Sequence, residues 1–181
     1  MKIGIDIDNT ITETSLLANL LVKNDYRYNE AKDYHNLSEE KLKDFLTNYL
    51  SDIVYNVNIK ADVKGTLEIW HNLGYKIIFI TARGVEKTNN FINLRTLHLT
   101  SMYFEKEKIP FDEIIFFKDS KAQTALKYKL DLFIDDKESV LDEMASVGIK
   151  TLRMTADLTS KHKIVNSWQE IQKIVSQMGD K

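Results

Sequence analysis

Residues 1–10 of the chain read MKIGIDIDNT, an alternating apolar run that ends in two carboxylates. Isoleucine at every second position is typical of a β-strand, and Asn9-Thr10 predicts the loop that follows it. Asp6 and Asp8 therefore stand at the carboxyl end of the predicted strand. Two like charges at such a place are unfavourable unless a cation offsets them or catalysis uses them.

The rest of the chain alternates predicted strands and helices. Strands are predicted at residues 75–81, 113–117, 131–134 and 149–153. Helices are predicted at residues 63–73, within 86–105, at 121–128, at 138–147, and from a cap at Asn166 or Ser167 to Val175. Gly74 and Gly148 are expected to close two of these helices. The alternation favours βαβ units in a parallel sheet, hence an α/β fold of three layers.

Residues 14–61 interrupt this alternation with two further predicted helices. Thr12 or Thr14 is expected to cap the first, and Ser38 the second, which runs to Ile53. An insertion of roughly fifty residues is too long for a plain loop. We therefore expect a Rossmann-like core of residues 1–13 and 62–181 and a small helical cap, 14–61, which excludes water and selects the leaving group.

The inner face of the helix within 86–105 is also predicted from apolar spacing. The side chains expected to face the core are Phe91, Leu94, Leu97, His98 and Met102.

Composition excludes several classes of protein. The absence of cysteine removes disulfides and thiolate metal sites, and a net charge of -2 gives no broad basic face for a polynucleotide. No signal-peptide pattern is present, and no apolar run approaches the roughly 20 residues of a membrane helix. The sequence predicts a cytoplasmic protein without membrane or polynucleotide partners, and it leaves a homodimer open.

Polar residues follow four of the predicted strands. In chain order they are Asp6 with Asp8, Thr81, a lysine near Lys121, and Asp135 with Asp136. The carboxyl ends of parallel strands share one edge of the sheet, so these side chains should converge. Carboxylate oxygens favour magnesium over zinc, and the lysine and hydroxyl supply donors for a phosphate. A carboxylate beside such a phosphate could attack phosphorus and form an aspartyl phosphate.

Four segments resemble the ordered motifs of phosphatases in the haloacid dehalogenase (HAD) superfamily. They are Asp6-Ile7-Asp8-Asn9-Thr10, Phe79-Ile80-Thr81-Ala82-Arg83, Lys121, and Phe133-Ile134-Asp135-Asp136. The Thr-Ala-Arg segment, the Leu-Phe-Ile-Asp-Asp run and residues 165–171 are similar to the 5′-nucleotidase group, including the 5′(3′)-deoxyribonucleotidases. The resemblance covers nearly the whole chain except the insertion.

This resemblance implies a role for each site residue. It implies that Asp6 is the nucleophile and that Asp8 is the general acid and base. It implies that Mg²⁺ is bound by the Asp6 carboxylate, the Asp8 carbonyl and Asp135, with Asp136 as a further ligand or a neighbour of the ligands. The residues expected to bind the phosphate are Asn9, Thr81, Ala82, Arg83 and Lys121.

Some assignments have alternatives. Lys118 and Lys127 compete with Lys121, which is favoured because it opens the helix after the third strand. Arg83 either orients substrate or pairs with an exposed carboxylate. A response-regulator receiver domain is disfavoured, because its acidic pair comes early and its lysine last, whereas here an acidic pair comes last. Glycine-rich nucleotide-binding loops are missing.

The sequence thus predicts a magnesium-dependent phosphomonoesterase acting on a small phosphorylated metabolite, with a nucleoside monophosphate as the leading candidate. The alternatives are a non-catalytic phosphate- or nucleotide-binding module, and a phosphatase of the same fold acting on sugar phosphates or polynucleotide ends.

Overall fold

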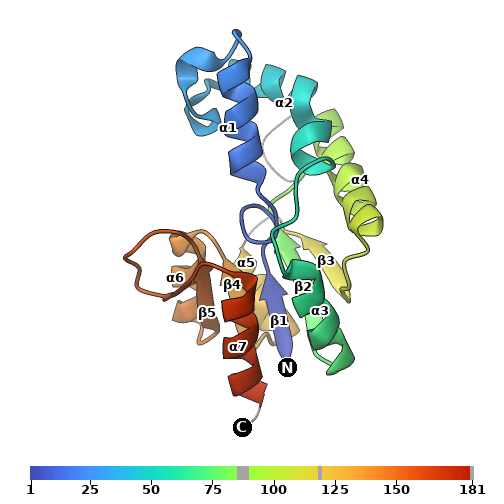
Figure 1. Cartoon of the computed structure of the whole chain (residues 1–181), viewed down its shortest axis with the longest axis vertical. Helices are drawn as coiled ribbons and strands as arrows, with labels where there is room; N and C mark the ends of the chain where they lie inside the picture. Colours follow the sequence, from blue (N-terminus) through green and yellow to red (C-terminus); the bar gives the residue numbers. More distant parts are fainter. Residues whose placement is uncertain (85–89, 118–119, 180–181) are drawn as a thin grey trace. The chain divides into compact units, whose positions relative to one another are not determined.

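The computed structural model describes residues 1–84, 90–117 and 120–179, and Figure 1 traces them from blue to red. The chain divides into two compact units. The first, the sheet unit, comprises Met1–Ile11, Ile59–Thr81 and Ile109–Lys181. The second, the helical unit, comprises Thr12–Asn58 and Ala82–Lys108.

The sheet unit is built on a six-stranded sheet in which every pair of neighbours is parallel. The strand order is β3-β2-β1-β4-β5-β6, which places β1 and β4 side by side at the centre. The strands are β1 (Lys2–Ile5), β2 (Lys76–Thr81), β3 (Glu113–Phe116), β4 (Leu132–Asp135), β5 (Lys150–Met154) and β6 (Lys163–Val165). This is the order of a doubly wound fold, in which ligands bind at the carboxyl ends of the strands.

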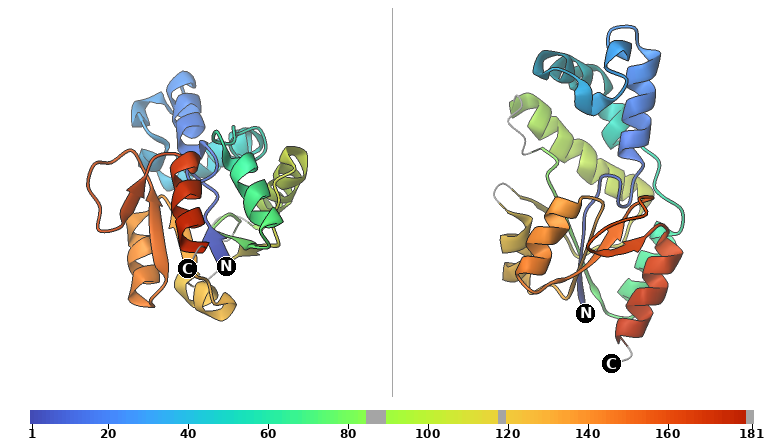
Figure 2. Two further views of the ribbon diagram at one scale, coloured as in Figure 1. Left: turned by 60° about the horizontal axis from the view of Figure 1, so that its bottom comes forward. Right: turned by 90° about the vertical axis from the view of Figure 1, so that its left-hand side faces the viewer.

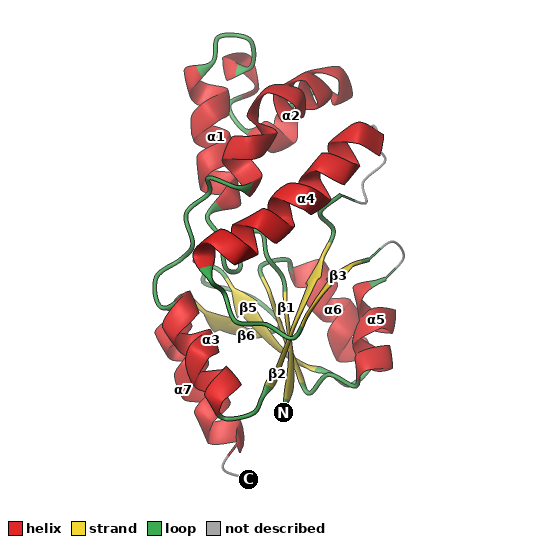
Figure 3. Ribbon diagram, turned by 90° about the vertical axis from the view of Figure 1, so that its right-hand side faces the viewer, coloured by secondary structure: helices red, strands yellow, loops and turns green. Residues whose placement is uncertain are grey.

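Helices cover both faces of the sheet. Figure 3 shows α3 (Val63–Asn72) and α7 (Trp168–Gly179) on one face, and α5 (Lys121–Tyr128) and α6 (Glu138–Ser146) on the other. The right-hand view of Figure 2 shows the same separation of α6 from α7. Every residue of β4 is buried, which is typical of a parallel strand covered on both faces. The predicted α/β fold is confirmed.

Close packing at the centre of the sheet explains one glycine. A Cβ atom at Gly4 of β1 would lie 2.4 Å from Leu130 Cδ1 and 2.5 Å from Phe133 Cδ2. On the opposite face, the buried indoles of Trp70 and Trp168 contact each other with ring centroids 5.9 Å apart. Glycine at position 4 therefore lets Leu130 and Phe133 pack against the backbone of β1, the strand that leads to the first carboxylates.

The helical unit has a core of its own. It contains α1 (Thr14–Asn24), α2 (Glu39–Val54), α4 (Asn90–Glu107) and two 3₁₀ turns, Asn29–Ala31 and Tyr34–Asn36. Tyr28 and Phe45 are buried in edge-to-face contact, with ring centroids 5.4 Å apart. Helix α4 packs on α2, and Arg95 Nη2 donates to Ser51 Oγ at 2.8 Å.

Contacts group the chain differently from the boundaries expected from sequence. Residues 82–108, which were expected in the core, belong to the same compact unit as the insertion, because α4 packs on α2. The short edge strand β6 was not expected, since three residues carry too little alternation to be read as a strand. In the part of the chain that the structure describes, no helix has the length and apolarity needed to cross a membrane.

The helix caps were predicted with mixed success. Ser38 Oγ accepts from Lys41 N at 3.3 Å, so its predicted cap is confirmed. Helix α1 instead begins after Glu13, which makes no side-chain cap, while the hydroxyls of Thr12 and Thr14 bond each other at 2.8 Å. The expected threonine cap is therefore wrong.

Candidate functional site

The ends of β1 and β4 bring two carboxylates together. The strands pair in parallel, and Asp6 N donates to Ile134 O at 2.9 Å directly beyond β1. This register sets Asp6 beside Asp135, the last residue of β4. Both are buried, Asp6 with 6% and Asp135 with 0% of its surface exposed. The two acidic segments predicted to converge do so.

Lys121 lies between these two carboxylates. Its Nζ is 2.5 Å from Asp6 Oδ1 and 2.7 Å from Asp135 Oδ2, and its side chain is only 6% exposed. Lys121 opens α5, whose N-terminus is capped by Ser120 Oγ through a 3.1 Å bond from Ala122 N. Lys127 is exposed further along the helix, and Lys118 lies outside the described residues.

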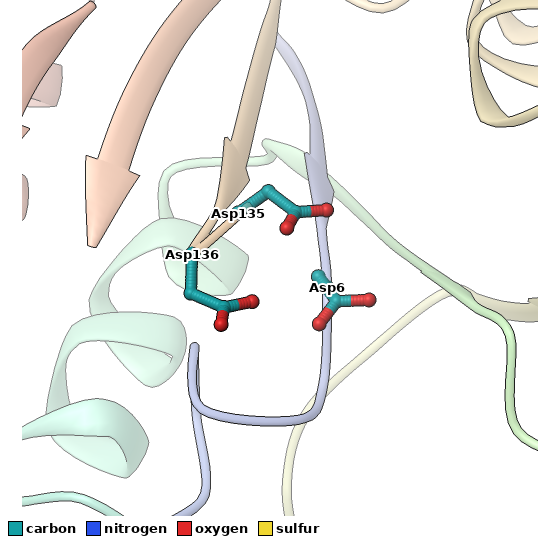
Figure 4. Close-up of side chains that lie close together, drawn as sticks. All are labelled: Asp6, Asp135 and Asp136. Carbon is teal, nitrogen blue, oxygen red and sulfur yellow. The ribbon is translucent and has the colours of Figure 1, made fainter. Parts of the chain in front are cut away.

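Asp136 completes a group of three carboxylates, drawn in Figure 4. Asp6, Asp135 and Asp136 each offer an oxygen within 4.8 Å of the other two. Asp136 Oδ2 accepts from Asn9 Nδ2 at 3.3 Å, whereas its buried Oδ1 has no hydrogen-bond partner among the described residues. A buried carboxylate oxygen without a donor, beside two more carboxylates, fits a hard divalent cation such as Mg²⁺.

Charge in this group is incompletely balanced. Burial, with the charge of Asp135, raises the pKa of Asp6 to about 7 although Lys121 opposes the shift. Burial also raises the pKa values of Asp135 and Asp136. For Lys121, burial lowers the pKa, but the attraction of Asp6 and Asp135 outweighs it and leaves the pKa above its usual range. The Lys121 ammonium contacts two of the three carboxylates, Asp6 and Asp135. A bound divalent cation would favour the ionised forms of all three.

The loop after β1 is a tight turn. Ile11 N donates to Ile7 O at 3.0 Å, and Asn9 has a φ of 61°, a left-handed conformation that asparagine tolerates better than most residues. Trp168 Nε1 donates to Thr10 O at 3.0 Å. The carboxylate of Asp8 adds to the charge that raises the pKa of Asp6, but it is not one of the three that could share a cation.

Thr81 ends β2, the strand on the other side of β1. It is buried, with 1% of its surface exposed, and its carbonyl accepts from Phe117 N at 3.2 Å. The next two residues, Ala82 and Arg83, belong to the helical unit. Arg83 is buried there, and its Nη1 lies 3.5 Å from Thr100 Oγ1.

Two further residues shape the site and were not singled out from sequence. Ser120 caps α5 and so orients Lys121, and a serine directly before a helix is a signal that could have revealed it. Arg153 Nε donates to Asp136 O at 3.2 Å from the neighbouring strand β5. Nothing in the local sequence around Arg153 predicts that contact.

Comparisons with known proteins identify the fold. No family model matches the chain, and no curated protein matches its sequence. A haloacid dehalogenase-like hydrolase from Streptococcus pneumoniae matches in structure with TM-score 0.61 at 14% identity, over 96% of this chain and 97% of the other. A protein described as a predicted phosphatase from Clostridium acetobutylicum gives 0.63 at 14%, over 97% and 98%.

A third similar structure is a HAD-superfamily hydrolase of subfamily IA from Geobacter sulfurreducens. Its TM-score is 0.59 at 12% identity, over 96% of this chain and 98% of the other. At such identities the likeness establishes the fold and nothing more. The chain therefore has the Rossmann-like α/β fold seen in haloacid dehalogenase-like hydrolases.

Proposed function

We propose that the chain is a magnesium-dependent phosphomonoesterase of the HAD superfamily that acts through an aspartyl phosphate on Asp6. The observation that carries the proposal is the contact of Lys121 with both Asp6 and Asp135, next to Asp136 Oδ1, which has no hydrogen-bond partner in the part of the chain that the structure describes. A carboxylate that can act as nucleophile, a fixed ammonium and carboxylate oxygens that can bind a metal are then brought together at the carboxyl ends of β1 and β4. The fold shared with HAD-superfamily hydrolases supports the same reading.

The carboxylates of Asp6, Asp135 and Asp136, with the Asp8 carbonyl, would hold Mg²⁺. When bound, the cation would neutralise phosphate charge and so allow an anionic nucleophile to approach phosphorus.

The chain's own residues would then divide the reaction into two steps. In the first, an Asp6 oxygen attacks phosphorus, the ester P–O bond breaks, and Asp8 gives a proton to the leaving alcohol. In the second, Asp8 removes a proton from water, which attacks the same phosphorus and frees Asp6 and inorganic phosphate. Lys121 and Thr81 would hold the phosphoryl oxygens throughout.

We further propose a nucleoside monophosphate as the substrate. The support is the resemblance of Thr81-Ala82-Arg83 and of residues 132–136 and 165–171 to the 5′-nucleotidase group. Several expectations from the sequence stay predictions. They are a cap of residues 14–61 that selects the leaving group, binding of phosphate by Asn9, Ala82 and Arg83, a cytoplasmic location and a homodimer.

The test is hydrolysis of p-nitrophenyl phosphate by the full chain, with Mg²⁺ and with a chelator. We expect turnover that requires Mg²⁺ and that is abolished by Asp6→Asn. Asp131→Asn is a matched control. Asp131 immediately precedes the first residue of β4, at the end of the strand opposite the site, and it accepts from Lys2 N at 2.7 Å. Retained turnover in Asp6→Asn would overturn the covalent mechanism.

Substrate class is tested separately with a panel of deoxy and ribo nucleoside monophosphates and sugar phosphates. We expect the highest kcat/KM on a nucleoside monophosphate. Preference for a sugar phosphate would keep the phosphatase and reject the nucleotidase. Turnover on no member of the panel, with binding of phosphate intact, would favour a non-catalytic binding module.

A further inference from the structure

Arg153 connects the backbone at Asp136 to two other segments of the sheet unit, the start of α6 and the loop between β5 and β6. It lies on β5 in register with Asp135 of β4, and its side chain is only 13% exposed. Its guanidinium uses all three of its nitrogens. Nε donates to Asp136 O at 3.2 Å, Nη1 to Glu138 Oε2 at 3.1 Å, and Nη2 to Asp157 Oδ2 at 2.9 Å.

The acceptor groups that bind the Arg153 guanidinium are themselves held by further hydrogen bonds. Glu138, the first residue of α6, accepts from Ser160 Oγ at 3.1 Å and from Lys161 N at 2.9 Å through its other oxygen. Arg153 Nη1 also reaches Thr159 O at 3.4 Å. The loop between β5 and β6 is therefore tied to the start of α6, with the arginine between them.

The Asp136 carboxylate has few restraints of its own. Its Oδ2 accepts from Asn9 Nδ2 at 3.3 Å, and its Oδ1 has no hydrogen-bond partner among the described residues. The direction of this carboxylate therefore depends on its backbone. Two bonds fix that backbone: Lys137 N donates to Asp135 Oδ1 at 2.9 Å, and Arg153 Nε donates to Asp136 O.

We propose that Arg153 is a positioning residue that holds the Asp136 peptide so that the Asp136 carboxylate faces Asp6 and Asp135. The inference rests on the proposed function, because it concerns the same metal site. The positioning role that we propose requires an arginine rather than another cationic residue. A guanidinium presents donors in a rigid planar fork and can bind three acceptors at once, whereas a lysine ammonium is a point charge on a flexible stem. Partners outside the ligand set commonly change metal affinity when they are removed.

The test measures binding of Mn²⁺ alone by electron paramagnetic resonance, on the full chain after treatment with a chelator. We expect Arg153→Gln and Arg153→Lys to weaken Mn²⁺ binding about tenfold. Asp157→Asn is the matched control, because it removes one partner of the guanidinium, an exposed carboxylate, and leaves the bond to Asp136 intact. We expect wild-type affinity in this control.

Thermal melting separates positioning from stability. A lower Tm with an unchanged Mn²⁺ Kd below the melting range would assign Arg153 a purely structural role and overturn the inference. Wild-type affinity in Arg153→Lys with weak binding in Arg153→Gln would assign the effect to charge and also overturn it. Should Arg153→Gln fail to fold, Arg153→Lys decides alone.

The same experiment distinguishes this inference from the proposed function. Asp136→Asn should lose Mn²⁺ binding if the metal site exists. Absence of binding in the wild type would overturn the metal site and this inference with it. Binding that is lost in Asp136→Asn but unaffected in both Arg153 variants would overturn the inference alone.

Discussion

Lys121 holds Asp6 and Asp135 together, because one buried ammonium contacts both carboxylates. Removing one partner of a buried ion pair leaves an uncompensated buried charge. This lowers the stability of the protein more than replacing both partners with apolar residues does. The sequence favoured this lysine over two others only because it opens a helix, and the structure gives the stronger reason, a distance of 2.5 Å to Asp6.

Lys121→Met should therefore lower both activity and stability. We expect kcat/KM on p-nitrophenyl phosphate to fall by at least about 100-fold, and the free energy of unfolding of the metal-free protein to fall by about 3 kcal/mol. Urea denaturation and steady-state kinetics measure the two effects. Lys127→Met, an exposed change on the same helix, should leave both values near those of the wild type. Equal effects from the two variants would contradict this role for Lys121.

The raised pKa of Asp6 predicts how stability depends on pH. An unfolded aspartate ionises near its ordinary value of 3.8, whereas folded Asp6 keeps its proton until about pH 7. The folded state thus binds more protons between these values, so the metal-free protein should lose stability as pH rises through this window. The contribution of Asp6 to the slope is at most about 1.4 kcal/mol per pH unit.

Denaturation of the metal-free wild type and of Asp6→Asn across this pH range checks the effect. The stability of Asp6→Asn relative to the wild type should grow from pH 4 to pH 7 and then level off. A constant difference between the two proteins would show that Asp6 titrates at its ordinary pKa.

At the scale of single elements, β1 depends on a residue with no side chain. A methyl group at Gly4 would overlap Leu130 and Phe133, so Gly4→Ala should destabilise the protein by about 1–3 kcal/mol. Gly65 offers a matched control on α3, where a Cβ would meet nothing within 4 Å. Gly65→Ala should be neutral or stabilise by up to about 1 kcal/mol, since alanine favours helix more than glycine does. Chemical denaturation of both variants provides the comparison.

In helix α4, the spacing of apolar residues predicted the wrong buried face. The expected inner face included Phe91, Leu94 and Met102, yet Phe91 and Leu94 are each 67% exposed and Met102 is 37% exposed. The buried stripe instead includes Ile92, Thr96, Leu99, Thr100 and Tyr103. The two threonines can be buried because each hydroxyl donates to the carbonyl four residues earlier, Ile92 O and Thr96 O. Counting apolar residues does not detect threonines whose hydroxyls are bonded in this way.

Two leucines of α4 distinguish these faces experimentally. Leu99 is 9% exposed and lies in the core of the helical unit, so Leu99→Ala should lower the free energy of unfolding by about 2–4 kcal/mol. Leu94→Ala, the same truncation on the exposed face, should change it by less than about 0.5 kcal/mol. A larger loss from Leu94→Ala would restore the face expected from the sequence.

At the scale of the whole molecule, the chain has 2 tryptophans, and both lie in the sheet unit. They are buried in mutual contact, and Trp168 also donates to the loop that follows β1. Intrinsic fluorescence should therefore report the unfolding of the sheet unit. Far-ultraviolet circular dichroism should report both units, because each contains helices.

Mg²⁺ should raise the Tm observed by tryptophan fluorescence, because a ligand that binds only the folded state stabilises it. At about 100 times its Kd the ion would add about 2.7 kcal/mol. Asp136→Asn should abolish the shift, and Asp131→Asn should preserve it. A shift of equal size in Asp136→Asn would place the ion elsewhere.

The sequence by itself determined the parallel α/β fold, the strand ends that carry Asp6 and Asp135, and the helix start at Ser38. It also determined the glycines that follow α3 and α6, Gly74 and Gly148, whose φ values are 75° and 82°. Periodicity, capping and turn chemistry act between residues a few positions apart, so they can be read along the chain.

Only the tertiary structure decided that Lys121 meets both carboxylates and that Arg153 bonds the carbonyl of Asp136. It also decided which face of α4 is buried and that residues 82–108 group with the insertion. Each of these depends on segments that are distant in sequence and meet only when strands pair and helices pack. The energies that decide these features come from contacts between elements, which the residues neighbouring in sequence do not predict.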